Sequence, residues 1–170
     1  RKKSFNHIVD DIAYCYCDFP TNNKKIYFPK RKTRFLSTCT EDDIGGLSKL
    51  PEVGKTLVIT KSYKDYRVLV NQGLTVVWLQ NETCLPKEKL SKLIKRFDKF
   101  VILYDNDKAG REGSEKIKGF IEGILPGVTR TVFVPELKGV TDPSDFIRYN
   151  ILDFKNFINY NFHEETNRSN

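Results

Sequence analysis

From about residue 55 onward, short segments of mostly apolar residues alternate with longer segments in which apolar residues recur at helical spacing. The apolar segments predict β-strands at residues 56–60, 74–79, 100–104 and 130–134. The segments between them predict helices at residues 64–72, with Gly73 just past the end, at 87–97 and at 112–125. Strands that are apolar throughout and alternate with helices are typical of a mainly parallel sheet covered by helices on both faces. The sequence therefore predicts an α/β fold.

The two ends of the chain follow other patterns and divide it into three regions, 1–54, 55–150 and 151–170. In the first region, residues 25–29 and 33–37 predict two short strands joined by a tight turn, which makes a small basic β-hairpin. The last region predicts an aromatic-rich helix at 151–162 that docks on the core, followed by a frayed tail at 164–170.

Composition narrows the class of protein and of partner. The chain has 170 residues, a net charge of +7 and no apolar run near the ~20 residues that a membrane span needs, so no membrane contact is expected. The positive surplus suggests a polyanionic partner, although a generally solvated basic surface has the same composition. The four cysteines form no C-x-x-C pair, and the two histidines, His7 and His163, lie far apart, which argues against a zinc site.

The predicted hairpin places cations among aromatic residues. Tyr27, Phe28 and Phe35 alternate with basic residues that would contact a phosphate backbone while the rings contact exposed bases. The alternative is a solvated hairpin whose rings point into the core. The cations assigned to nucleic acid are Lys30, Arg31, Lys32 and Arg34.

Carboxylates follow the predicted strands. Asp105 and Asp107 come after the third strand and project to the same side, where a hard divalent cation such as Mg²⁺ would relieve their repulsion. Asp65 follows the first strand and Asp142 the fourth, so a parallel sheet would bring these acids to one edge. Simpler roles stay open, because Asp107 and Asp142 are also suited to cap the helices that follow them. Glu82, after the second strand, would lie at the same edge.

Three segments, "ITKSYKD", "VILYDNDKAG" and "GVTDPSDF", lie in this order at the ends of predicted strands. Together they resemble the Toprim domain, which is shared by bacterial and phage primases, topoisomerases of types IA and II and some nucleases. The resemblance covers residues 55–149, and the "KIYFPKRKTRFLS" segment before them is similar to the lead-in of phage and plasmid primase-like proteins. It implies a Toprim-like, Rossmann-like sheet.

The first motif departs from the family pattern. A typical first motif has Glu-Gly where this chain has Lys61-Ser62, so the resemblance carries over the family's mechanism only in part. Lys61 could hold a phosphate, or it could pair with Asp105 or Asp107 in place of one metal ion. We favour the phosphate role, because Ser62 and Lys64 beside it also suit an anion at a helix N-terminus. Glu82 is a candidate replacement for the missing carboxylate.

The resemblance implies a DNA primase of a phage or mobile element, which builds RNA primers on single-stranded DNA from nucleoside triphosphates with Mg²⁺ or Mn²⁺. Such a protein would be fused to a helicase or act with one, in the cytoplasm of a bacterial or phage-infected cell. Whether the chain is an active enzyme stays open, and a Toprim module that only binds nucleic acid and a Toprim nuclease are the alternatives. The residues assigned by this reading are Lys61, Asp65 and Asp105 for catalysis, Asp105, Asp107 and Asp142 for metal, and Lys64 and Lys108 for phosphate, beside the hairpin cations.

Overall fold

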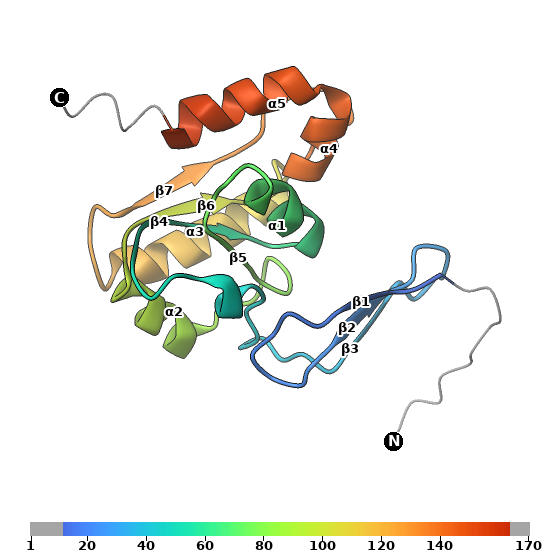
Figure 1. Cartoon of the computed structure of the whole chain (residues 1–170), viewed down its shortest axis with the longest axis horizontal. Helices are drawn as coiled ribbons and strands as arrows, with labels where there is room; N and C mark the ends of the chain where they lie inside the picture. The colour runs from blue at the N-terminus through green and yellow to red at the C-terminus, as the bar shows by residue number, and fades with distance from the viewer. Residues whose placement is uncertain (1–11, 164–170) are drawn as a thin grey trace.

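The main body of the molecule is a parallel four-stranded sheet (Figure 1). The structure, a computed structural model, describes residues 12–163, so His7 and the tail predicted at 164–170 lie outside the described residues. The strand order is β5-β4-β6-β7. The strands are β4 (Gly54–Thr60), β5 (Val76–Trp78), β6 (Phe97–Leu103) and β7 (Thr129–Val132). The predicted fold class is therefore confirmed.

Helices cover both faces of this sheet (Figure 1). One face packs against α2 (Lys87–Ile94) and α3 (Lys108–Glu122) through a buried cluster that includes Leu57, Leu93 and Ile117. The helices on the other face are α1 (Tyr63–Val70), α4 (Pro143–Tyr149) and α5 (Ile151–Ile158), which continues into a π-helical turn at Asn159–His163. Within residues 12–163, none of the helices has the length and apolar character needed to cross a membrane.

Element ends differ from the sequence prediction for local reasons. Phe97 was expected on the second helix, but it opens β6, where it pairs with Gly54 and is buried. An apolar residue at this position fits the apolar face of a helix and the first position of a buried strand equally well. Periodicity therefore could not assign Phe97 to one element or the other. The third helix begins at Lys108 rather than near 112, because the Asp107 side chain accepts a hydrogen bond of 2.7 Å from the Gly110 backbone N–H. The first helix ends at Val70 rather than at residue 72, and Gly73, with a φ of 80°, lies in the turn that follows it.

A separate antiparallel sheet lies beside the main one (Figure 1). Its strands are β1 (Tyr14–Tyr16), β2 (Lys25–Tyr27) and β3 (Phe35–Ser37). The last two form the predicted hairpin. The first strand was not predicted, because three residues are too few to show a period. Phe28 follows β2 and is 4% exposed, so of the three hairpin rings it is the buried one.

Asp43 joins the small sheet to the rest of the molecule. It is 2% exposed, and its carboxylate accepts hydrogen bonds from Thr21 Oγ1 (3.1 Å), Asn23 Nδ2 (2.8 Å) and the Thr40 backbone N–H (2.8 Å). Its backbone oxygen accepts from the side chain of Gln80, after β5. Burial alone would raise the pKa of Asp43, but the hydrogen bonds outweigh burial and hold this pKa below its ordinary value of 3.8.

We expect Asp43→Asn to lower the free energy of unfolding by about 2 kcal/mol, because the new amide group faces two N–H donors. A group with a depressed folded pKa stabilises the fold above its unfolded pKa, so the difference from wild type should shrink as pH falls below 3.8. Urea titrations from pH 3 to pH 7 measure both effects, with the exposed Asp42→Asn as the matched control. Equal stability of the two variants at pH 7 would contradict this role of Asp43.

Candidate active site

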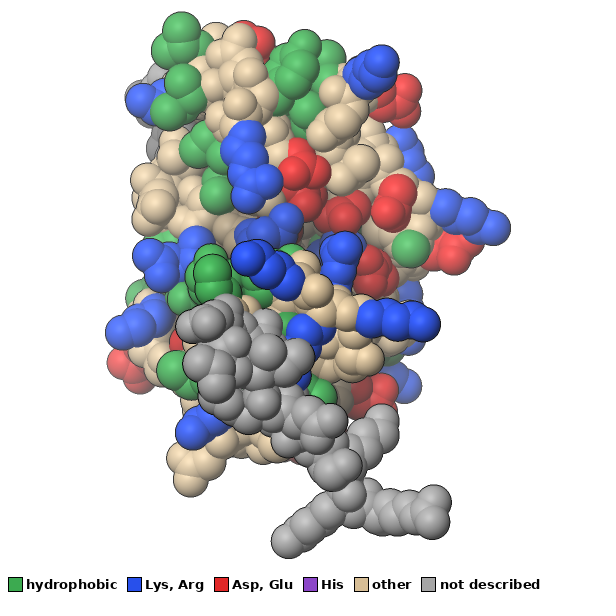
Figure 2. Space-filling model, turned by 90° about the vertical axis from the view of Figure 1, so that its right-hand side faces the viewer, with side chains coloured by type: hydrophobic (Ala, Val, Ile, Leu, Met, Phe, Trp, Pro, Cys, Tyr) green, Lys and Arg blue, Asp and Glu red, His purple; other side chains and the backbone are tan. Residues whose placement is uncertain are grey.

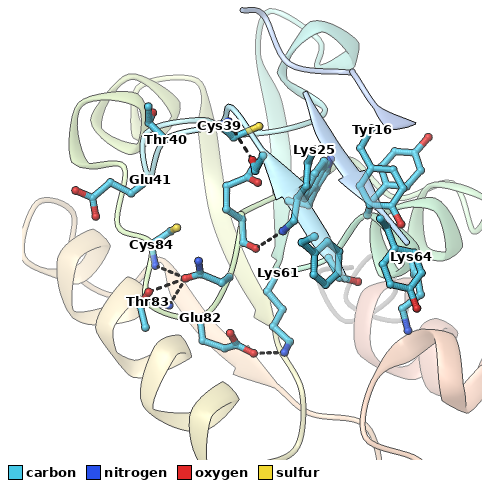
Figure 3. Close-up of a pocket in the computed structure, with 18 residues that line it drawn as sticks. Tyr16, Lys25, Cys39, Thr40, Glu41, Lys61, Lys64, Glu82, Thr83 and Cys84 are labelled. Atoms are coloured by element: carbon cyan, nitrogen blue, oxygen red, sulfur yellow. Dashed lines mark hydrogen bonds and ion pairs between the residues drawn. The ribbon is translucent and has the colours of Figure 1, made fainter. Parts of the chain in front are cut away.

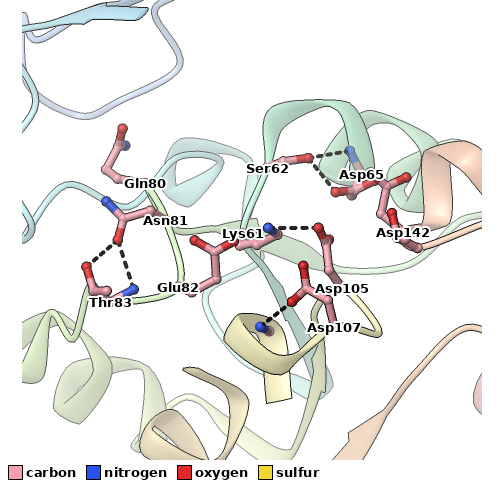
Figure 4. Close-up of polar contacts among 12 residues, drawn as sticks. Lys61, Ser62, Asp65, Gln80, Asn81, Glu82, Thr83, Asp105, Asp107 and Asp142 are labelled. Carbon is pink, nitrogen blue, oxygen red and sulfur yellow. Dashed lines mark hydrogen bonds and ion pairs between the residues drawn. The ribbon is translucent and has the colours of Figure 1, made fainter. Parts of the chain in front are cut away.

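Three aspartates converge at the carboxyl edge of the main sheet (Figure 4). Asp65 lies in the first turn of α1, Asp105 follows β6, and Asp142 is the residue before α4. Each offers a carboxylate oxygen, and these three oxygens all lie within 4.8 Å of one another. Segments up to 77 residues apart in sequence therefore build one acidic cluster, which we call the acidic trio.

Two serines hold two members of the trio, Asp65 and Asp142, in place. Ser62 caps α1, accepting a hydrogen bond from the Asp65 backbone N–H, and its hydroxyl donates to the Asp65 carboxylate. Ser144 donates from its backbone to Asp65 Oδ1 (3.0 Å) and from its hydroxyl to Asp142 Oδ1 (2.8 Å). Asp142 also caps α4 through the Asp145 N–H (2.7 Å). The capping role expected for Asp142 is therefore real, and it orients the carboxylate toward the other two acids.

The electrostatics of the trio favour a bound cation. Burial, followed by the charge of Asp142, raises the pKa of Asp65 to about 6. Burial also raises the pKa of Asp105, against the opposing effect of Lys61. In addition, Asp105 Oδ1 is buried without a hydrogen-bond partner in the described structure. A divalent cation with oxygen ligands would satisfy that atom and relieve the repulsion, so the residues present fit a magnesium or manganese ion.

Lys61 is the cation already built into this edge. Its ammonium group lies 2.8 Å from Asp105 Oδ2 and also pairs with the carboxylate of Glu82 (Figure 4). Burial lowers the pKa of Lys61, but the hydrogen bonds to these two acids outweigh burial and raise it to about 12. Of the two roles considered for Lys61, neutralisation of a site carboxylate matches these contacts.

The other residues assigned from the sequence are spread around the trio. Asp107 lies beside Asp105 and caps α3, and the three carboxylates that converge are those of Asp65, Asp105 and Asp142 (Figure 4). Lys64 reaches toward Asp142 Oδ2 at 3.4 Å and is half exposed. Lys108 is 90% exposed and pairs with Glu112 on its own helix. The hairpin cations lie in the turn between β2 and β3, away from the trio; they are Lys30, Arg31, Lys32 and Arg34.

A cleft of about 710 Å³ separates the small sheet from the carboxyl edge of the main sheet. Figure 3 shows Tyr16 and Lys25, from the small sheet, and Lys61 and Lys64, from the β4–α1 connection, along its walls. Tyr16 stacks on Tyr63 with ring centroids 4.5 Å apart. Sequence analysis missed both tyrosines. The one available signal was the alternation of Tyr14, Cys15 and Tyr16, which puts two rings on one face of a strand.

If Lys61 competes with a metal ion for Asp105, then Lys61→Gln should raise the affinity for Mn²⁺ by about tenfold, because a repelling charge is removed and a carboxylate oxygen is released. Calorimetry or electron paramagnetic resonance with Mn²⁺ alone measures this. Lys108→Gln removes the same charge from an exposed neighbouring position and should change the affinity little. Unchanged or weaker Mn²⁺ binding by Lys61→Gln would refute the competition.

Comparisons with known proteins bear on the fold that carries this site. No family model matches the chain. A DNA primase of Clostridium acetobutylicum is 32% identical over 99 residues, which are 58% of this chain and 16% of that primase. The chain therefore corresponds to a small part of that protein's length.

Solved primase structures share the fold. The primase fragment of the bacteriophage T7 primase-helicase protein matches with a TM-score of 0.60 and 18% identity, over 88% of this chain and 63% of that one. The DnaG primase catalytic domain bound to single-stranded DNA matches with a TM-score of 0.63 and 16% identity, over 80% and 48%. The E. coli primase catalytic core matches with a TM-score of 0.56 and 16% identity, over 79% and 47%. The chain therefore has the fold of DNA primase catalytic domains, the Toprim fold that its sequence motifs resemble.

Proposed function

We propose that the chain is the Toprim part of a DNA primase, which joins nucleoside triphosphates into an RNA primer on single-stranded DNA in the presence of Mg²⁺ or Mn²⁺. The observation that carries the proposal is the acidic trio, buried at the carboxyl edge of a primase-like sheet and adjoining a cleft lined by cations and aromatic rings. A curated relative is a DNA primase, and one structural neighbour is part of a primase-helicase, so a helicase partner or fusion belongs to the proposal.

In this function Asp65, Asp105 and Asp142 would hold a divalent ion. Such an ion, when bound, supplies charge neutralisation for a triphosphate and activation of an attacking hydroxyl group. Lys64, on the first turn of α1 and lining the cleft, would hold a phosphate there. Lys61 would fix the orientation of Asp105 and balance part of the negative charge of the site. Glu82 would supply a carboxylate at this edge in place of the glutamate that a typical first Toprim motif has at position 61. Its negative charge is paired with the ammonium group of Lys61.

A second function is favoured by the same lysine. If the ammonium group of Lys61 takes the position of a required metal ion, the domain would bind nucleic acid without joining nucleotides. The contacts of Lys61 with Asp105 and Glu82 support this alternative as much as they support a modified active site.

The experiment is primer synthesis by the full protein that contains this segment, on single-stranded DNA with labelled nucleoside triphosphates and Mg²⁺ or Mn²⁺. We expect short RNA products, and we expect Asp105→Asn to reduce them by a factor of about 100 or more, because the site loses a charged ligand. Asp98→Asn, on the exposed side of β6, is the matched control and should leave synthesis unchanged. DNA binding without products would favour the binding module, and cleavage of DNA without nucleotides would identify a nuclease.

The hairpin cations generate a separate prediction. Replacing Lys30, Arg31, Lys32 and Arg34 by glutamine should weaken binding to single-stranded DNA and flatten its dependence on salt, by up to roughly 0.7 in the log–log slope for each phosphate that the hairpin no longer neutralises. Fluorescence anisotropy at several salt concentrations measures the slope. A control with the same reduction in charge changes the exposed residues Lys87, Lys92, Lys95 and Lys155. If both variants shift the slope equally, the effect comes from net charge rather than from the hairpin.

A further inference from the structure

Three aromatic rings lie side by side across the small sheet. Tyr14 pairs with Tyr27 across β1 and β2, and Tyr27 pairs with Phe35 across β2 and β3, so all three project from one face. Their centroids are 6.3 Å and 5.0 Å apart, with angles between ring planes of 26° and 27°. We call this row the aromatic ladder.

The ladder belongs to the face that borders the cleft. Side chains alternate along a strand, so Tyr16 and Lys25 share the face of the ladder, and both line the cleft together with Tyr27 and Phe35. Its outer rings are open to solvent, since Tyr14 is 54% and Phe35 48% exposed. Packing of the core therefore does not account for these rings.

The ladder also leads to the acidic edge. Next to Tyr14 on the same strand, Tyr16 stacks on Tyr63, the first residue of α1. Lys61 and Glu82 line the same cleft and contact each other. Lys61 also contacts Asp105, a member of the acidic trio. A ligand that covers the ladder would thus extend toward the acidic trio without leaving the cleft.

Positive charge surrounds the rings. The Lys25 ammonium group lies 4.9 Å from the centroid of Phe35 and donates to the Gln80 backbone oxygen. Lys30, Lys32 and Arg34 are exposed in the turn that joins two of the ladder strands. Figure 2 shows Lys and Arg side chains spread across the end of the molecule that carries the small sheet. Flat rings with cations beside them fit a chain of unpaired bases and phosphates.

We propose that the aromatic ladder is a stacking platform for the bases of single-stranded DNA, which it holds in line with the acidic edge. This inference rests on the proposed function for the identity of the strand, and it adds the surface that contacts the bases. Stacking on rings tolerates any base, which suits a template of varied sequence. The competing explanation is that the rings only stabilise the small sheet through cross-strand contacts.

The test measures how tightly the full protein binds two fluorescent oligodeoxynucleotides of equal length, with EDTA present. One has a mixed sequence, and the other is abasic at its central positions. The abasic strand keeps its phosphates and lacks the bases that would stack. Wild type should bind the base-bearing strand roughly tenfold more tightly, and Tyr14→Leu with Phe35→Leu should remove most of that preference while changing affinity for the abasic strand less than twofold. Tyr14→Phe should retain the preference.

Controls separate stacking from folding and from surface area. Tyr149→Leu changes a tyrosine that is 58% exposed on α4 and should behave as wild type. Thermal unfolding reports whether the ladder variants keep the fold. A wild type without preference for bases, or ladder variants that lose affinity for both strands equally, would overturn the inference. Primer synthesis is measured separately. If the preference for bases is present and no primers are made, the proposed function is wrong and the ladder inference stands. If primers are made and the preference is absent, the ladder inference is wrong and the proposed function stands.

Discussion

The repulsion among buried carboxylates at one sheet edge is the constraint on which this site depends. The carboxyl ends of parallel strands lie at the same edge of a sheet, so acidic residues that follow these strands lie close together even when no positive charge neutralises them. Ser62 and Ser144 stabilise Asp65 and Asp142 by hydrogen bonds, yet burial still raises the pKa of Asp65 to about 6. Hydrogen bonds therefore orient these acids without removing their electrostatic cost, and a positive charge has to complete the site.

Lys61 supplies part of that charge within the chain itself. It takes up one oxygen of Asp105 and leaves the other buried and without a hydrogen-bond partner in the described structure. At the same time it pairs with Glu82, which follows the neighbouring strand β5. At the end of β4 the chain therefore has a base, and the acid that pairs with it comes from the end of β5. Two carboxylates share this one ammonium group, so Lys61 neutralises Glu82 as well as part of the charge of Asp105.

The sequence was sufficient for the main sheet, because strands such as 56–60 and 100–104 are apolar throughout and the helices between them are strongly periodic. It was sufficient to bring Asp65, Asp105 and Asp142 to one edge, since that follows from parallel strands. It did not distinguish Asp107 from Asp65 as the third member, because both follow a strand and the pattern does not give the direction of either carboxylate. Nor did it show that Lys61 reaches Asp105 and Glu82, a contact set by packing between strands far apart in sequence.

In the small sheet, the sequence pattern could not tell which of the three hairpin rings is buried. A hydrophobic pattern identifies residues that fold a chain, and by that criterion Tyr27, Phe28 and Phe35 were equivalent. Burial separates them, since Phe28 is buried while the other two remain on the face toward the cleft. Asp43 then fixes the position of that face by hydrogen bonds from Thr21 and Asn23. Lys61, whose ammonium group contacts Asp105, lines the same cleft as Tyr27 and Phe35, so the cleft joins the face that carries the rings to the edge where the acids are buried.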